Sequence, residues 1–368
     1  MDKVRFVIVG AGVMGKVHAK NMKTAENSQL VAICDVNREA GEALAREYGV
    51  KYFDKYEDCF ESGEVEAAIV ATPHYFHPPI AVAAMERGIH VLCEKPLAVT
   101  VSEADRMAEE ATKSGVRYGV MFQRRTHPAF RKARELIDSG ALGEIWRTMM
   151  VETEWFRPQA YYNSGGWRGT WAGEGGGVLM NQAPHSLDIF TWLTGLPAKV
   201  DGRVATLHHD IEVEDTASAM LTYANGGSGY FTTSTWEYPG ESMIRVIGSE
   251  GVLQINGRKQ MRMGKSTPGA LEFSRTSQEM FGTPKVEWTE IKTEEAPWGS
   301  AVVAENFAQS VRDGRELTAP GVDGGRSLEL ANAIVLSSYK GKPVTLPIDR
   351  EEYDKLLRKL VKSSKARK

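Results

Sequence analysis

Two short patterns in the first hundred residues place backbone and side chains where they could do chemistry. The first is a glycine-rich turn that follows an apolar run and opens a helical pattern: Gly10-Ala11-Gly12-Val13-Met14-Gly15. In that context the first glycine permits a tight turn, the second lets backbone approach a pyrophosphate, and the third lets helix and strand pack closely. The free N–H groups of the helix start favour the anion. We predict a dinucleotide site here; a glycine-rich turn without a ligand is the alternative.

An acidic residue at the end of the next predicted strand extends this pattern. Asp35 lies about 20 residues after Gly15, the spacing at which a carboxylate binds ribose hydroxyls and repels a 2′-phosphate. We therefore expect the cofactor to be NAD, with Asn37 beside it. Arg38 could meet a phosphate, which keeps NADP as the less favoured choice. A turn or capping role for Asp35 is the alternative without a ligand.

The second pattern is Glu94-Lys95-Pro96, which follows an apolar run at residues 89–93. Ligands of doubly wound sheets bind where such strands end. Pro96 restricts the backbone of Lys95 to extended or turned conformations, which fixes the direction of the amine. Burial beside a cationic nicotinamide would lower the pKa of Lys95 from about 10.4 toward values useful for proton transfer. A surface lysine in a turn is the alternative.

The elements that must position these residues follow from the hydrophobic pattern. Short apolar runs alternate with helical patterns, which predicts a parallel sheet between helices, with strands at residues 4–9, 30–34, 67–71, 89–93 and 116–121. Later runs at 213–224, 229–237 and 243–247, with a hairpin signal at 225–227, predict an antiparallel sheet. A helix at 185–193 interrupts it, and helices return at 301–313, 325–339 and from 351.

We therefore predict an α/β plus α+β fold with two domains. A Rossmann dinucleotide-binding domain spans residues 1–123, and a substrate-binding and oligomerisation domain spans residues 124–368. The C-terminal helices are expected to pack back onto the first domain.

The composition excludes several classes of function. The 368 residues carry 45 Lys and Arg against 48 Asp and Glu, a net charge of −3, which leaves no basic face for nucleic acid or an anionic membrane. No apolar run approaches the roughly 18 residues of a membrane helix, and the first residues enter a strand directly, so we expect a cytoplasmic protein. The cysteines show no C-x-x-C pair and are expected to be buried thiols: Cys34, Cys59 and Cys93.

Four motifs, taken in order, resemble the Gfo/Idh/MocA oxidoreductase family. They are the turn at residues 10–15, Ala71-Thr72-Pro73 with His77, Glu94-Lys95-Pro96, and the segment 175–188, which reads GGGVLMNQAPHSLD. The resemblance runs nearly end to end. It implies a Rossmann domain that binds a nicotinamide cofactor with help from Thr72, Pro73, His77, Glu94 and Lys95. It also implies a C-terminal α/β domain with an open, mostly antiparallel sheet that supports homodimers or homotetramers.

The resemblance also assigns the chemistry to Lys95 and His185, which would flank a sugar or polyol. Asn181 stands four residues before His185, where many inositol-dehydrogenase-like members have Asp. An amide supplies no negative charge, so Asn181 would orient His185 or bind a substrate hydroxyl. This version resembles the branch that oxidises the C3 hydroxyl of sugar rings, including glycosides and nucleotide sugars. On the residues alone, His185 would be a satisfied histidine on an amphipathic helix near Asp188.

We therefore expect an NAD-dependent dehydrogenase or reductase acting on a secondary alcohol of a sugar or glycoside. Lys95 and His185 would take the hydroxyl proton while a hydride passes to the nicotinamide. The alternatives are an inositol or other polyol dehydrogenase, an oxidoreductase for an aromatic dihydrodiol or biliverdin, and a non-enzymatic regulator that binds NAD and a sugar. An intact Lys95 and His185 pair argues against the regulator.

An aromatic segment between residues 155 and 171 is the predicted substrate loop. Aromatic rings stack on the C–H faces of sugars, and Arg or Tyr can bind hydroxyls. The predicted contacts are Tyr161, Tyr162, Trp167 and Arg168. Packing at a domain seam or subunit interface is the alternative.

Two histidine clusters could suggest a metal. They are His74-x-x-His77 and His208-His209-Asp210. Neither has a third and fourth ligand at a persuasive spacing, and alcohol oxidation by NAD with a lysine base needs none. We expect no metal.

Overall fold

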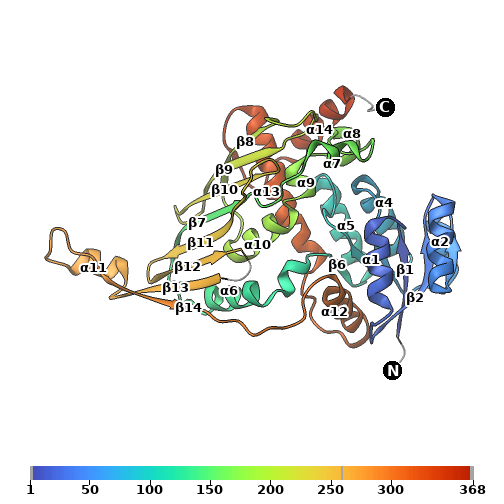
Figure 1. The fold of residues 1–368 in the computed structure, drawn as a ribbon, viewed down its shortest axis with the longest axis horizontal. Coiled ribbons are helices and arrows are strands. Elements are labelled where there is room, and N and C mark those ends of the chain that lie inside the picture. Colours follow the sequence, from blue (N-terminus) through green and yellow to red (C-terminus); the bar gives the residue numbers. More distant parts are fainter. Residues whose placement is uncertain (1–2, 258–259, 365–368) are drawn as a thin grey trace.

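The computed structural model describes residues 3–257 and 260–364, which build two sheets (Figure 1). Sheet A has six parallel strands in the order β3-β2-β1-β4-β5-β6, the doubly wound order of dinucleotide-binding domains. Its strands are β1 Val4–Val9, β2 Ser28–Cys34, β3 Lys51–Phe53, β4 Ala67–Val70, β5 His90–Cys93 and β6 Tyr118–Val120. Its helices are α1 Val13–Met22, α2 Arg38–Tyr48, α3 Tyr56–Glu61, α4 His77–Met85 and α5 Val101–Ser114, with 3₁₀ turns η1 His74–Phe76 and η2 Gln123–Thr126.

The register of sheet A places the predicted chemistry along one edge. Helices cover both faces, so the central strands are apolar throughout, as in β4, whose four residues are all buried. Val9 lies opposite both Cys34 and Val70, and Val70 lies opposite Cys93. Because these last residues align, the chain leaves four neighbouring strands side by side. The glycine turn, Asp35, the 71–73 segment and Glu94 therefore share one edge.

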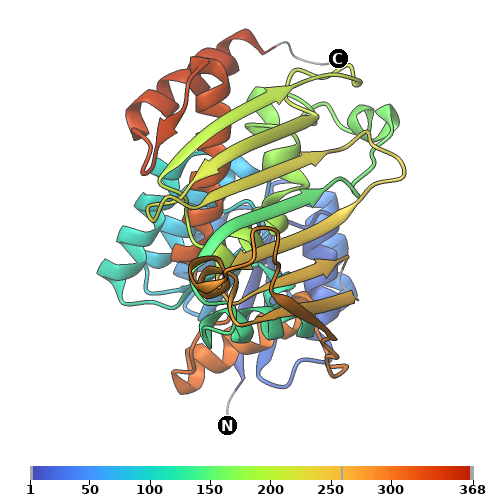
Figure 2. The same cartoon turned by 90° about the vertical axis from the view of Figure 1, so that its left-hand side faces the viewer.

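Sheet B has nine strands in the order β14-β13-β12-β11-β7-β10-β9-β8-β15, antiparallel except for the β7–β10 pair. The strands are β7 Ile145–Glu152, β8 Lys199–Ala205, β9 Thr216–Thr222, β10 Ser228–Ser234, β11 Ser242–Gly248, β12 Gly251–Asn256, β13 Gln260–Thr267, β14 Lys285–Glu290 and β15 Val344–Thr345. Buried residues alternate with partly or fully exposed ones along β9 and with partly exposed ones along β12. Figure 2 shows the broad outer face of the sheet without a helical layer over it. Sheet B is thus open on one side.

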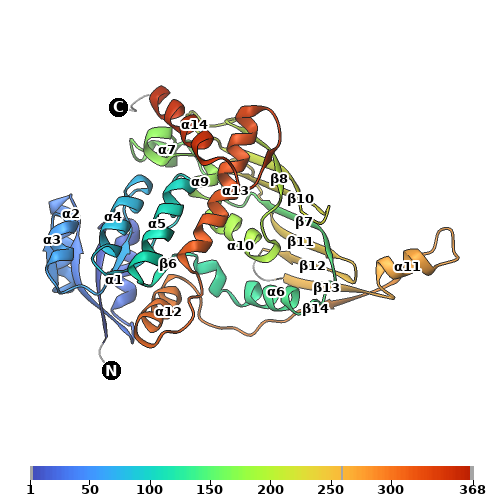
Figure 3. The ribbon, with the colours of Figure 1, turned by 180° about the vertical axis from the view of Figure 1, so that it is seen from behind.

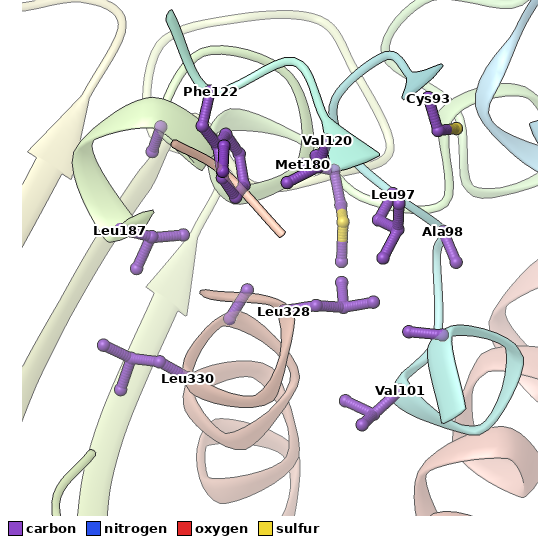
Figure 4. Close-up of a cluster of buried hydrophobic side chains, with 14 of the residues drawn as sticks. Cys93, Leu97, Ala98, Val101, Val120, Phe122, Met180, Leu187, Leu328 and Leu330 are labelled. Atoms are coloured by element: carbon purple, nitrogen blue, oxygen red, sulfur yellow. The ribbon is translucent and has the colours of Figure 1, made fainter. Parts of the chain in front are cut away.

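The inner face of sheet B is covered by helices that also contact the first domain. The helices after β6 are α6 Pro128–Asp138, α7 Gln159–Asn163, α8 Trp171–Glu174, α9 Val178–Asn181, α10 Pro184–Thr194, α11 Ala270–Thr276, α12 Ser300–Asp313, α13 Gly321–Lys340 and α14 Arg350–Ser363. Of these, α11 has no buried residue and α12 packs on sheet A, so neither covers the inner face of sheet B. Figure 3 shows α10 and α13 between the two sheets. There Met180, Leu187 and Leu328 pack with side chains of the first domain such as Phe122 and Leu97 (Figure 4). One apolar core joins the two halves.

Helix α12 returns to the first domain and covers its sheet. The Phe307 ring lies 6.2 Å from that of Phe6 in β1, and the Asn21 amide donates to the Ser300 hydroxyl at 2.9 Å. After α12, the Val120 N–H of β6 donates to the Ala319 carbonyl at 3.0 Å. Residues 300–319 are therefore built into the first domain.

The predicted fold class is confirmed: a Rossmann domain with a parallel sheet, followed by a domain with an open, mostly antiparallel sheet. The five predicted strands correspond to β1, β2, β4, β5 and β6. Sequence patterns missed β3, β7, β8, β12, α3, the one-turn helices α7 to α9, and the arm formed by β13, α11 and β14 that projects from the body in Figure 1. Among these, β3, α3, the one-turn helices and the arm are short or exposed and carry little periodicity. The division at residue 123 stays a prediction.

Candidate active site

The glycine turn joins β1 to α1 at the edge of sheet A where the strands end. Gly10 has a φ of +108°, and a Cβ there would lie 2.6 Å from the carbonyl oxygen of Ala71. A Cβ on Gly15 would lie 1.9 Å from the carbonyl oxygen of Gly10. Both positions therefore exclude side chains because backbone occupies that space.

Gly12 is the exception in this turn, because a Cβ there would meet no described atom within 4 Å. It is the N-cap of α1 and is exposed, with Val13 79% exposed and Met14 partly exposed just after it. Free N–H groups at this helix start face open space. The residues present thus fit a bound pyrophosphate at Gly12, close to backbone.

Asp35 faces the glycine turn from the end of β2. Its Oδ2 accepts a hydrogen bond from the Ala11 N–H at 2.5 Å, and its Oδ1 accepts from the Asn37 N–H at 2.7 Å. A carboxylate has about four acceptor sites, so Asp35 can hold the turn and still accept from ribose hydroxyls. The Asn37 side chain caps α2 by accepting from Ala40 N at 3.1 Å.

Arg38 is engaged by its own helix. Its Nε donates to Glu42 at 2.8 Å and its side chain is 78% exposed. The hydrogen bond and charge of Glu42 raise the pKa of Arg38 above its ordinary value. The guanidinium is therefore already paired, which weakens the case for a 2′-phosphate contact.

We predict that Asp35→Ser lowers the preference for NAD over NADP by at least about tenfold, the loss of one strong hydrogen bond plus the relief of repulsion. The ratio of kcat/KM values for the two cofactors measures this. Arg38→Ala is the matched control and should leave the ratio within about twofold, since Arg38 is paired with Glu42. An unchanged ratio in Asp35→Ser would remove Asp35 from cofactor selection.

The loop after β4 is tied to the lysine loop by His77. Its Nδ1 lies 2.8 Å from the Pro96 carbonyl oxygen and its Nε2 lies 2.7 Å from that of Thr72, and the residue is 1% exposed. The ring therefore positions two loops from behind. The Thr72 Oγ1 is buried and has no hydrogen-bond partner among the described residues, while Pro73 is exposed. Thr72 thus offers a polar group to a bound cofactor.

Glu94 links the lysine loop to α1 through His18, which sequence patterns did not single out. The Glu94 Oε1 lies 2.7 Å from His18 Nε2, and both side chains are buried. Its Oε2 accepts from the Lys95 N–H at 3.1 Å. Burial alone would raise the pKa of Glu94, but the His18 hydrogen bond and the charges of His18 and Lys95 hold it below its ordinary value. His18 lies one helical turn after Gly15 on α1, and this spacing is the sequence feature that could have indicated its role.

Lys95 reaches from the end of β5 into the second domain. Its Nζ donates to the Asn181 carbonyl oxygen at 3.0 Å, and the Lys95–Pro96 peptide bond is cis. Burial lowers the pKa of Lys95 below its ordinary value; the carboxylates of Glu94 and Glu174 oppose this shift, and the guanidiniums of Arg168 and Arg157 reinforce it. A lysine with a lowered pKa can accept a proton nearer neutral pH.

His185 lies in the first turn of α10 and is buried against the Phe122 ring, 6.1 Å away. Burial, with the charges of Lys95 and Arg124, holds the pKa of His185 well below its ordinary value, so the ring is neutral. Its Nδ1 is buried with no hydrogen-bond partner among the described residues. Asp188, the neighbour on the same helix, is bound instead by Arg125, whose Nε lies 3.0 Å from Oδ2.

Asn181 is held between a carboxylate and a tyrosine. Its Nδ2 donates to the Glu174 Oε1, and its Oδ1 accepts from the Tyr161 hydroxyl at 3.4 Å. The Tyr161 hydroxyl in turn accepts from Arg168 Nη1 at 2.7 Å and from Gln182 Nε2 at 3.3 Å. Glu174 is a site residue that no sequence pattern predicted. Only its position just before the triple glycine could have suggested it.

The four predicted substrate contacts of the aromatic segment have different surroundings in the structure. Tyr161 and Arg168 join the Asn181 network, with Arg168 lying 4.5 Å from the Tyr161 ring and 4.4 Å from that of Trp167. Trp167 is 36% exposed. Tyr162 is instead 2% exposed, and its hydroxyl bonds to Thr235 Oγ1 at 2.8 Å. Its side chain packs the domain interior, which corrects its assignment to the substrate.

The histidine clusters have other partners. His74 Nδ1 donates to the Glu174 carbonyl oxygen at 2.9 Å, and His209 Nδ1 lies 3.0 Å from Asp215. Burial, with the charge of His77, lowers the pKa of His74 to about 3. Across the described ranges, no three His, Cys, Asp or Glu side chains are grouped to hold a metal ion. Nor does any helix in those ranges have the length and apolarity to cross a membrane.

A partly buried lysine with a lowered pKa, at the edge of a dinucleotide-binding sheet, suits a nicotinamide-dependent oxidoreductase. Comparison with known proteins agrees. The model of the Gfo/Idh/MocA oxidoreductases with an NAD-binding Rossmann fold matches residues 4–122, and the model of the GFO/IDH/MocA C-terminal domain matches residues 130–254. The chain belongs to the Gfo/Idh/MocA family, and the predicted family and NAD cofactor are both confirmed.

Individual relatives differ in substrate. The chain is 26% identical to scyllo-inositol 2-dehydrogenase (NAD(+)) of Bacillus subtilis over 95% of this chain and 98% of the relative. It is 33% identical to D-glucoside 3-dehydrogenase of Escherichia coli over 53% of this chain and 55% of the relative. The WlbA dehydrogenase of Bordetella pertussis, solved with NADH and UDP-GlcNAcA, superimposes with a TM-score of 0.79 at 30% identity, covering 94% and 100% of the two chains.

Proposed function

We propose that this protein oxidises a secondary alcohol of a sugar or glycoside with NAD, at the C3 hydroxyl. The observation that carries the proposal is the position of Lys95: the amine of this partly buried side chain is bonded to the Asn181 backbone, and its charge acts on His185. The two groups that could handle a hydroxyl proton therefore lie at one place. That place is the edge of sheet A beside the predicted nicotinamide site.

Each side chain has a defined task in this reaction. Lys95 accepts the hydroxyl proton, which its lowered pKa permits. When bound, the nicotinamide supplies the hydride acceptor. His185, neutral because of its burial, exchanges a hydrogen bond with the same hydroxyl. The Asn181 amide is left to orient a neighbouring hydroxyl through its oxygen, because its N–H₂ group is bound by Glu174.

Choice of the C3 hydroxyl of a sugar rests on Asn181 and on the similarity to D-glucoside 3-dehydrogenase. The similarity to scyllo-inositol 2-dehydrogenase supports the second candidate, an inositol or other polyol dehydrogenase. The retained pair of Lys95 and His185 argues against a non-enzymatic regulator.

A spectrophotometric screen of NAD and NADP against free sugars, inositols, anhydrosugars, glycosides and nucleotide sugars tests the proposal. Reduction of NAD with a glycoside or sugar, and a 3-keto product identified by NMR, is the expected result. Turnover with inositols alone would favour the polyol dehydrogenase, and a keto group at another carbon would refute the C3 assignment.

Tyr161→Phe is expected to raise KM for the sugar by about 5- to 10-fold, the value of one lost hydrogen bond, with little change in thermal stability. Tyr161 Oη binds Arg168 and Asn181, so its loss frees both groups. Tyr162→Phe is the matched control. The Tyr162 hydroxyl binds Thr235 in the interior, so its loss should lower the free energy of unfolding by about 1 kcal/mol while KM stays unchanged. The reverse pattern would place the substrate elsewhere.

Assembly and location stay predictions. We propose a homodimer or homotetramer formed through the open face of sheet B (Figure 2), where Met220 is 56% exposed. A cytoplasmic location remains as expected from the sequence.

A further inference from the structure

Glu174 is a buried carboxylate that the proposed reaction leaves without a task. It ends α8, its side chain is 1% exposed, and helix α8 lies beside η1 of the first domain. Its Oε2 accepts from the Gly169 N–H at 2.6 Å, its Oε1 accepts from Asn181 Nδ2, and Arg168 Nη1 lies 3.7 Å from Oε1. All of these partners are donors. The contacts are therefore those of an ionised carboxylate, which needs no proton to satisfy them.

The carboxylate fixes which way the Asn181 amide points. Because Oε1 can only accept, the N–H₂ end of Asn181 faces Glu174 and the oxygen end faces the Tyr161 hydroxyl. The backbone oxygen of the same Asn181 accepts from Lys95 Nζ at 3.0 Å. One residue thus joins Glu174 to the lysine. With a carboxylic acid at position 181 two negative groups would meet, so an amide is the side chain that fits.

The charge of Glu174 also acts on the lysine itself. Burial lowers the pKa of Lys95, and Glu94 and Glu174 are the two carboxylates that oppose this. Burial raises the pKa of Glu174 above its ordinary value, although the hydrogen bonds from Gly169 and Asn181 and the charges of Arg168 and Lys95 oppose this shift. The ionisable groups that act on Lys95, or on which it acts, come from every surrounding element: Glu94, Glu174, Arg157, Arg168, His74, His77 and His185. Glu94, one of the two carboxylates that oppose the shift of Lys95, is itself bound by His18.

We propose that Glu174 is a positioning residue: it orients Asn181 toward the substrate and supplies, from α8, the negative charge beside Lys95 that an amide at 181 lacks. This inference rests on the proposed function for its effect on turnover. Its effect on Lys95 itself is independent of substrate. A purely structural Glu174 would stabilise α8 and leave the titration of the lysine unchanged.

The sign of the effect follows from the charges. A carboxylate stabilises the ammonium form of Lys95, so its removal lowers the pKa of the lysine further. Oxidation needs the neutral amine, and its rate therefore falls as the pH drops through this pKa. In Glu174→Gln the acid limb of kcat/KM should move about one unit to lower pH, with a smaller kcat because Asn181 loses its orientation. In Glu174→Gln with Asn181→Asp the limb should return toward that of the wild type.

Competitive labelling of lysines with acetic anhydride, read by mass spectrometry at a series of pH values, reports the pKa of Lys95 in the full-length protein without substrate. We expect it to fall by about one unit in Glu174→Gln and to recover in the double variant. Glu212→Gln is the matched control, because Glu212 accepts from the Trp171 N–H at the other end of α8; the Lys95 pKa should stay unchanged. Glu174→Asp keeps the charge and should titrate like the wild type.

The outcomes separate the two proposals. An unchanged Lys95 pKa in Glu174→Gln, with thermal unfolding like that of the wild type, overturns the role of Glu174. If Glu174→Gln does not fold, the double variant and Glu174→Asp provide the test. A Lys95 pKa that differs from the wild-type value by one unit or more in either variant overturns the role of Glu174. A shifted Lys95 pKa in a protein that oxidises no sugar upholds the electrostatic link and refutes the proposed function.

Discussion

Lys95→Met is expected to reduce kcat by about 1,000-fold or more, the usual contribution of a general base, while NADH affinity changes little. Methionine keeps the length of the side chain but cannot accept a proton. It also loses the bond from Nζ to the Asn181 carbonyl oxygen. Steady-state kinetics with the best substrate of the screen, and fluorescence titration with NADH, measure the two effects.

Lys95→Arg sharpens this test. A guanidinium retains the positive charge and a donor for the Asn181 oxygen, yet it stays protonated at any working pH. If Lys95 acts as a base, both variants lose turnover; if it acts only by charge or by bonding Asn181, arginine should restore a large part of it. Lys20→Met, an exposed lysine on α1, controls for the loss of a lysine. Turnover retained in Lys95→Met would remove Lys95 from the mechanism.

Gly12→Val is expected to weaken NADH binding by about 100-fold, the loss of one or two charge-assisted hydrogen bonds, without destabilising the protein. A side chain at Gly12 meets no described atom within 4 Å in the protein itself. It would fill the space in front of the N-terminus of α1 where a pyrophosphate is predicted. Fluorescence titration and thermal unfolding, run on the same sample, measure the NADH affinity and the stability.

Gly15→Ala provides the contrast. Its Cβ would lie 1.9 Å from the Gly10 carbonyl oxygen, so the turn must move, at a cost of at least about 3 kcal/mol in stability. The pair of variants thus separates a glycine kept for a ligand from one kept for the fold. Strong NADH binding by Gly12→Val would place the pyrophosphate elsewhere, and a stable Gly15→Ala would show that the turn can adjust.

The sequence predicted most of what depends on a regular pattern. Strand β1 and the glycine turn are read from an apolar run followed by fixed spacing, and the end of β5 locates Lys95 for the same reason. Asp35 follows from its distance to Gly15. Fold class, family and cofactor were all accessible in this way because each depends on local order along the chain.

Contacts between distant segments could not be predicted. The charge of Glu174 acts on Lys95 across 79 residues of chain, and His18 bonds to Glu94 across 76, so no local pattern joins either pair. Adjacent tyrosines at 161 and 162 look alike in the sequence, yet one binds Asn181 and the other Thr235. A one-turn helix, α7, points them in different directions. Such short helices carry too few residues for a periodic signal.

Helix α12 has a consequence for how this protein could be cut or recombined. It follows sheet B in the chain but packs against β1 and α1, so residues 1–123 alone would expose the face that Phe307 covers in the intact chain. The nucleotide-binding half is thus not a transferable module. A chimera that exchanges it between relatives must carry residues 300–313 along, because the last third of the gene encodes part of the first domain's interior.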